Sequence, residues 1–461
     1  MRRTKTLSFF ILILAICLLP SCGALAAEPN TVLKDFIAKP DPAYKWEVID
    51  STTQENVVIH RLLLTSQVWR GGEWTHQLTV ILPDVIQPSG HALLFISAGG
   101  NKDGKPTLTD ASRADIRMMI PIAGKTGSPV AVLRQVPNQP LYDNLREDKL
   151  ISYTFDQYLK TGDASWPLLL PMVKSAVRGM DAVVEFVRQE RNVAIEKFIV
   201  SGASKRGWTT WLVGAADPRV AAIAPMVIDT LNFEKQMPYQ LKVWGEYSRK
   251  IGDYTNLELQ QRMESERGKW LNGIVDPYSY IKDIEVPKLI FIGTRDPYWP
   301  IDAVKHYYDV LVGPKFIHYT PNAGHGLASG EEAARTLGGF FADRVSGVDC
   351  PDFSSKAEVK DGSFVLEITT DTRPKAFRLW GVASESRDFR IPSVGSSILN
   401  CMTLVESEGR EGSTVLAFKL PPETYSAFYG EMVLPSATFG EYSICTRMYV
   451  VDKDGIVDRE N

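Results

Sequence analysis

Ser204 lies in a segment whose residue types fit a nucleophilic serine. Phe198 to Val200 is an apolar run that predicts a short buried strand, and after Lys205 the Trp, Leu and Val residues recur at helical spacing. A serine in the turn between such a strand and helix is typical of a nucleophile elbow, where flanking glycines allow close packing. Residues 202–207 are Gly-Ala-Ser-Lys-Arg-Gly, so the second glycine comes one position later than in the usual G-x-S-x-G pattern.

A nucleophilic serine needs a base that takes its proton, and the base needs an acid that orients it. The chain has six histidines, and five of them fall within predicted strands or helices: His60, His76, His91, His306 and His318. Only His325 lies in a loop just beyond a predicted strand, between two glycines. We therefore predict that His325 is the base.

Asp296 holds the equivalent position after the preceding predicted strand, 288–292. The order serine, acid, histidine is that of the α/β-hydrolases. Asp229, which follows the predicted strand 222–228, is the alternative acid, although it could also cap the segment that begins at Thr230. We favour Asp296 because it follows directly on its strand.

The oxyanion of such a reaction needs backbone N–H donors. The N–H of Lys205, at the start of the predicted helix, is one candidate, and the N–H groups of Gly99 and Gly100, after the predicted strand 91–97, are the others. Lys205 and Arg206 also place positive charge beside the serine. That charge would favour an anionic substrate or support the oxyanion; the alternative is that both side chains are solvated at the helix start, where cations are mildly unfavourable.

Strand-like and helix-like segments alternate through the first three quarters of the chain. The predicted strands are 57–64, 77–82, 91–97, 129–136, 198–200, 222–228, 288–292 and 315–319, with an amphipathic helix over 168–186. This alternation predicts a mostly parallel eight-stranded sheet covered on both faces. Together with the order of Ser204, Asp296 and His325 it predicts an α/β-hydrolase fold over residues 27–345. A helical insertion over about 230–285 is expected to form a cap over the site, with Trp299 near the cleft.

From about residue 350 the hydrophobic period changes to two. Strand-like runs at 363–369, 376–380, 415–420 and 443–451 predict a small all-β sandwich over 350–461. Cys350, Cys401 and Cys445 all lie in this part, and in an exported protein one pair of them could form a disulfide.

The composition is that of a globular protein of two domains, with 461 residues, 44% hydrophobic and 23% charged. The net charge of -4 gives no basic footprint for nucleic acid. Residues 1–26 combine basic residues, a short apolar run and Ala24-Leu25-Ala26, which predicts a cleaved signal peptide and no membrane span in the mature chain. Lipid anchoring at Cys22 is disfavoured because Pro20 is unusual in a lipoprotein box.

Several short segments stand out along the chain: Lys45-Trp46, Thr75 to Leu78, Phe95 to Asn101, Ser201 to Trp208, Asn322 to His325 and Arg387 to Arg390. Together they resemble the PhoPQ-activated pathogenicity-related proteins. The resemblance implies an exported protein of α/β-hydrolase type whose natural substrates are poorly defined, with secreted eukaryotic relatives that act as proliferation-repressing signals. The elbow is also similar to that of glucuronoyl and acetyl-xylan esterases, which have a basic residue after the serine.

These observations predict a secreted serine hydrolase that cleaves an ester or amide bond through Ser204, His325 and Asp296 and an acyl-enzyme. The expected substrate is a small molecule, a peptide or a carbohydrate ester, and no cofactor or metal is implied. A serine peptidase uses the same residues and stays an alternative. The other alternative is a binding or signalling protein that keeps the fold without turnover.

Overall fold

The computed structural model describes residues 28–458 apart from 88, 391–398, 407–411 and 423. The predicted signal peptide, 1–26, and Cys22 therefore lie outside the described residues. Within them, no helix combines the length and the apolar character needed to cross a membrane.

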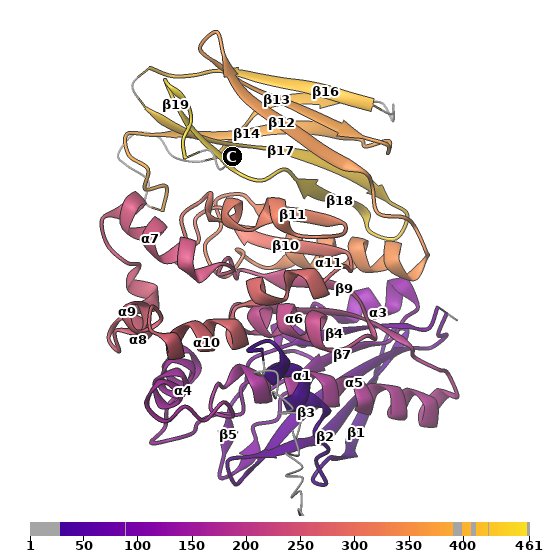
Figure 1. Ribbon diagram of the computed structural model, residues 1–461. Coiled ribbons are helices and arrows are strands. Elements are labelled where there is room, and N and C mark those ends of the chain that lie inside the picture. The colour runs from indigo at the N-terminus through magenta and orange to yellow at the C-terminus, as the bar shows by residue number, and fades with distance from the viewer. Residues whose placement is uncertain (1–27, 88, 391–398, 407–411, 423, 459–461) are drawn as a thin grey trace, which may run out of the picture.

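One twisted sheet runs through the whole molecule (Figure 1). Its first nine strands lie in the order β1-β2-β3-β7-β4-β8-β9-β10-β11. Their bounds are β1 (Lys45–Gln54), β2 (Val57–Trp69), β3 (Gly72–Pro83), β4 (His91–Ile96), β7 (Val130–Leu133), β8 (Lys197–Ala203), β9 (Val220–Met226), β10 (Lys288–Gly293) and β11 (Lys315–Thr320). A separate short hairpin joins β5 (Asn101–Lys102) and β6 (Lys105–Pro106).

The strands from β7 to β11 are parallel, whereas β1, β2 and β3 join them through antiparallel pairs. The sheet is therefore mostly parallel in this part, as the sequence predicts. β1 is an additional strand that the sequence analysis misses. Most of its residues are exposed, so it lacks the apolar run on which the other predictions depend.

Helices cover both faces of the sheet and divide the apolar core into two clusters. The first cluster includes residues of α1 (Thr31–Ala38), α5 (Leu169–Arg191) and α6 (Lys205–Ala216). The second includes residues of α2 (Ala114–Arg117), α3 (Ile120–Thr126) and α11 (Glu331–Val345). The amphipathic helix predicted over 168–186 is α5.

A group of helices follows β9 and lies to one side of the sheet in Figure 1. It contains α7 (Phe233–Trp244), α8 (Gly252–Thr255), α9 (Leu259–Arg262) and α10 (Glu266–Val275). Helix α4 (Glu147–Thr161), which the sequence analysis does not predict, packs against α8, α9 and α10. We call α7 to α10 the cap.

The C-terminal strands form two sheets that pack face to face. One is a separate sheet of β12 (Phe353–Lys360), β13 (Ser363–Thr370) and β16 (Gly412–Lys419). The other continues the central sheet and contains β14 (Ala376–Ser384), β15 (Asn400–Glu406), β17 (Tyr425–Ser436), β18 (Gly440–Cys445), β19 (Tyr449–Asp452) and β20 (Gly455–Ile456). The rings of Phe364 and Phe428 stack between them, with centroids 4.7 Å apart. This C-terminal β region has the architecture of the predicted sandwich.

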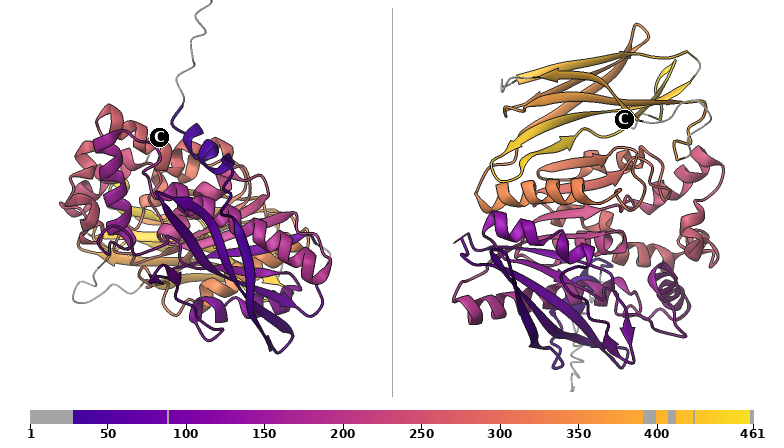
Figure 2. Two further views of the ribbon diagram at one scale, coloured as in Figure 1. Left: turned by 90° about the horizontal axis from the view of Figure 1, so that it is seen from below. Right: turned by 180° about the vertical axis from the view of Figure 1, so that it is seen from behind.

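The C-terminal β region is joined to the rest of the protein more closely than a separate domain would be. β18 pairs antiparallel with β11 at Cys445 and Ile317, so the central sheet continues into the C-terminal strands (Figure 2). The region also contacts the cap. Arg387 donates a hydrogen bond of 2.7 Å to the hydroxyl of Tyr239 on α7.

Cys350, Cys401 and Cys445 are free thiols. Cys445 is buried, Cys401 is exposed and Cys350 is partly exposed. The disulfide that the sequence analysis considered for one pair of them is not formed.

Candidate active site

Ser204 occupies a sharp turn between β8, which ends at Ala203, and α6, which begins at Lys205. Its backbone has φ 59° and ψ -127°, a conformation that residues with a side chain rarely adopt. The N–H of Ser204 donates a hydrogen bond of 2.8 Å to the carbonyl of Met226, at the end of β9. The strained residue is thus attached to the neighbouring strand, as in a nucleophile elbow.

Gly207 explains why the second glycine of the elbow comes one position late. A Cβ atom at this position would lie 2.7 Å from Cγ2 of Ile228 and 2.8 Å from the carbonyl oxygen of Met226. Only a residue without a side chain therefore lets α6 pack this closely against the end of β9. The position before it is Arg206, whose side chain donates hydrogen bonds to the carbonyl of Val136, beyond the end of β7, and to Glu147.

Ser204, His325 and Asp296 form a chain of hydrogen bonds. His325 Nε2 lies 2.9 Å from Ser204 Oγ, and His325 Nδ1 lies 2.8 Å from Asp296 Oδ2. The second carboxylate oxygen of Asp296 accepts a 3.0 Å hydrogen bond from the N–H of Tyr298. In this arrangement the imidazole can take the serine proton while the carboxylate orients the ring.

Tyr298 also packs against the imidazole of His325, with ring centroids 4.2 Å apart and 30° between the planes. The sequence analysis favours Trp299 as the aromatic residue near the cleft. Trp299 does line the cavity beside Ser204, and Tyr298 lines it as well. No periodic signal distinguishes two adjacent aromatic residues in a loop, so the contact of Tyr298 with the imidazole could not be predicted.

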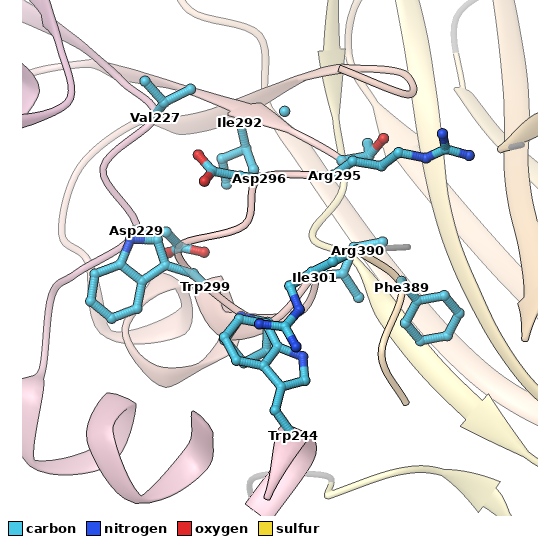
Figure 3. A pocket seen from close by; sticks show the side chains of 13 residues that line it. Val227, Asp229, Trp244, Ile292, Arg295, Asp296, Trp299, Ile301, Phe389 and Arg390 are labelled. Atoms are coloured by element: carbon cyan, nitrogen blue, oxygen red, sulfur yellow. The ribbon is translucent and has the colours of Figure 1, made fainter. Parts of the chain in front are cut away.

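Asp229, the alternative acid, is 4% exposed, and among the described residues it makes no hydrogen bond to His325. Burial, together with the nearby charge of Asp296, raises the pKa of Asp229 to about 7. Both carboxyl groups line a small cavity of about 10 Å³, which Figure 3 shows together with Trp244 and Arg390. The imidazole is thus paired with Asp296 and not with Asp229.

The two basic side chains after the serine are paired with acids. Lys205 Nζ lies 2.9 Å from Glu147 and 3.3 Å from Asp148, and Arg206 makes two hydrogen bonds of 2.7 and 2.8 Å to the carboxylate of Glu147. Burial would raise the pKa of Glu147, but the hydrogen bonds and charges of Arg206 and Lys205 outweigh it and lower the pKa. The positive charge that the sequence places beside the serine is therefore neutralised.

Gly99 and Gly100 follow β4, whose last residue, Ile96, is in register with Gly202 of the elbow strand. A Cβ atom at Gly99 would lie 2.8 Å from the N–H nitrogen of Gln135, so a larger residue would displace this loop. Of the three predicted oxyanion donors, Lys205 is among the described residues that line the cavity beside Ser204, whereas Gly99 and Gly100 are not.

A cavity of about 550 Å³ opens at Ser204 and His325. Its walls come from the loops at the carboxyl ends of β8, β9 and β10, from α4 and α6, and from the cap. The described part of the chain contains no group of three or more His, Cys, Asp or Glu residues placed to hold a metal ion.

The strand order, the parallel strands from β7 to β11 and the serine in the turn after β8 define an α/β-hydrolase fold. The chain belongs to the PhoPQ-activated pathogenicity-related protein family, whose model matches residues 33–390. Over 384 residues it is 30% identical to autocrine proliferation repressor protein A of Dictyostelium discoideum, and the match covers 78% of this chain and 76% of that protein.

Solved structures with a similar fold include two hydrolases. The acetyl xylan esterase from Paenibacillus sp. R4 has 15% identity and a TM-score of 0.45, over 67% of this chain and 92% of that chain. The acylaminoacyl peptidase of Pyrococcus horikoshii has 15% identity and a TM-score of 0.40, over 65% of this chain and 50% of that chain. Both are similarities of fold, and the assignment of the fold rests on the strand order described above.

Proposed function

We propose that this protein is an exported serine hydrolase that cleaves an ester or amide bond through an acyl-enzyme. The observation that supports this best is the hydrogen-bonded chain Ser204, His325 and Asp296, with distances of 2.9 and 2.8 Å, beside a large cavity. Each of the three side chains follows the carboxyl end of a different strand of the sheet, which is where ligands bind in open α/β sheets.

In the proposed reaction Ser204 Oγ attacks the substrate carbonyl while His325 Nε2 takes the hydroxyl proton. Asp296 stabilises the imidazolium, and the oxyanion accepts a hydrogen bond from the N–H of Lys205, which lines the cavity. His325 then gives its proton to the leaving alcohol or amine, and the acyl group stays on Ser204. A water molecule, deprotonated by His325, releases the acid and restores the serine.

The test is the rate of labelling of the purified protein by a fluorophosphonate. We expect rapid labelling of the wild type, none of Ser204→Ala, and labelling of His325→Ala that is slower by about 10²–10⁴-fold, the usual contribution of a general base. Asp296→Asn should slow labelling strongly and Asp229→Asn much less. The exposed Ser346→Ala is the control and should label like the wild type.

Folded wild-type protein that takes no label would refute the proposal and favour a binding protein that keeps the fold without turnover. Strong slowing in Asp229→Asn together with wild-type labelling of Asp296→Asn would reverse the assignment of the acid. Export is a separate part of the proposal, and it rests on the signal-like residues 1–26. N-terminal sequencing of the secreted protein should find a mature start near Ala27.

A further inference from the structure

The cavity beside Ser204 is lined mainly by apolar and aromatic side chains, many of which come from α4 and the cap. The residues that matter most here are Phe155, Phe233, Met237, Ile251, Leu259 and Met263. At about 550 Å³ the cavity has the size of sites that hold drug-sized ligands. A small acyl group such as acetyl would leave most of this apolar surface without contact.

The charges around the cavity are not suited to an anion. Lys205, the cation nearest to the serine, is already paired with Glu147 and Asp148 at 2.9 and 3.3 Å. Glu234 and Glu264 also line the cavity and are exposed to solvent, and neither belongs to an ion pair among the described residues. The remaining cation is Lys269, whose Nζ lies 3.6 Å from Glu266.

We propose that this cavity binds a bulky, uncharged, apolar group attached to the carbonyl that Ser204 attacks, and that it selects against anionic groups such as uronates. The inference rests on the proposed function of Ser204 and specifies its substrate class. It follows from two independent features, the apolar wall under the cap and the carboxylates of Glu234 and Glu264, which have no cationic partner in the described part of the chain. Burying one methylene group strengthens binding by about fourfold, so a chain of several carbons should be clearly preferred over a methyl group.

The experiment compares three fluorophosphonates that differ in one substituent, which is methyl, octyl or a carboxyalkyl chain as long as octyl. The second-order rate of labelling of Ser204 is measured by intact-protein mass spectrometry. We expect octyl to react at least about tenfold faster than methyl, since several methylene groups are buried. The carboxyalkyl probe should react at least about tenfold more slowly than octyl.

Two sets of variants test the two features separately. Met237→Gln should reduce the ratio of octyl to methyl rates, and Met118→Gln, a methionine of similar partial exposure outside the cavity, should not. The double variant Glu234→Gln/Glu264→Gln should reduce the disadvantage of the carboxyalkyl probe. Its control replaces two exposed glutamates outside the cavity, Glu73→Gln/Glu358→Gln, and should leave all three rates unchanged.

Labelling of Ser204 at equal rates by the methyl and octyl probes would overturn this inference and leave the proposed hydrolase intact. Faster labelling by the carboxyalkyl probe than by octyl would also overturn it. If none of the three probes labels the folded wild type, the proposed function itself fails, and the substrate inference fails with it.

Discussion

Asp229→Asn is expected to remove a pH-dependent part of the stability of this protein. Asp229 is 4% exposed, and burial raises its pKa to about 7 from the ordinary value of 3.8. The charge of Asp296 acts in the same direction. The folded protein therefore keeps a proton on Asp229 in a range of pH in which the unfolded chain has released it.

The sign of the effect follows from this difference in bound protons. Between about pH 4 and pH 7 the folded state binds more protons at Asp229 than the unfolded state, so the free energy of unfolding falls as the pH rises. Above about pH 7 Asp229 is ionised in both the folded and the unfolded state, and its contribution to the free energy of unfolding is completely lost. A pKa that is higher by about three in the folded state corresponds to a loss of at most roughly 4 kcal/mol in the free energy of unfolding.

Urea unfolding of the wild type and Asp229→Asn between pH 4 and pH 8 measures the effect. The asparagine variant should gain stability relative to the wild type as the pH rises, by up to about 4 kcal/mol over the range. Other titrating groups cancel in this difference, including Asp276, whose pKa burial raises to about 6. The exposed Asp103→Asn is the control and should show no such trend.

A difference between wild type and Asp229→Asn that stays constant from pH 4 to pH 8 would refute the reasoning. Asp229 would then be ionised in the folded protein, next to Asp296. A difference that changes in the opposite direction would refute it as well, because Asp229 would then have a lowered pKa and an undetected cationic partner.

Three further substitutions have expected outcomes. Gly207→Ala should destabilise the protein by about 1–3 kcal/mol in thermal unfolding, because its Cβ would lie 2.7 Å from Ile228, whereas Gly252→Ala, with nothing within 4 Å of its Cβ, should be close to neutral. Arg387→Met should increase hydrogen exchange in α7, since it removes the 2.7 Å hydrogen bond to Tyr239, and unchanged exchange there would contradict this role. Glu147→Gln should lower stability by about 2 kcal/mol, since two cations lose their shared carboxylate, and an unchanged melting temperature would contradict this.

The positions that the sequence predicts well are those attached to buried strands. Ser204, Asp296 and His325 each follow a short apolar run, and such runs report strands that are covered on both faces. Because parallel strands place their carboxyl ends at one edge of the sheet, residues after three such runs come together there. Their proximity could thus be inferred before any contact was known, while their chemical role remains a prediction.

The continuation of the central sheet into the C-terminal β region could not be predicted in this way. The pair between Ile317 on β11 and Cys445 on β18 joins strands that are far apart in the sequence. The alternation of side chains along a strand is the same whether the edge of the strand is free or paired, because pairing uses backbone groups. The change of period near residue 350 reveals a new set of strands, and it carries no information on which edge they join.

The ion pairs of the two cations beside the serine could not be predicted from the sequence either. Sequence alone places Lys205 and Arg206 next to Ser204 and suggests a cationic site, but Glu147, their partner, begins a helix that the sequence analysis misses. Gln139 donates to the carboxylate of Glu147 at 2.6 Å and to the carbonyl of Gly99 at 3.0 Å, so the same network holds the glycine loop and the start of α6. Since Glu147 and Asp148 balance both cations, the proposed mechanism leaves the neutral backbone N–H of Lys205 to face a substrate oxyanion.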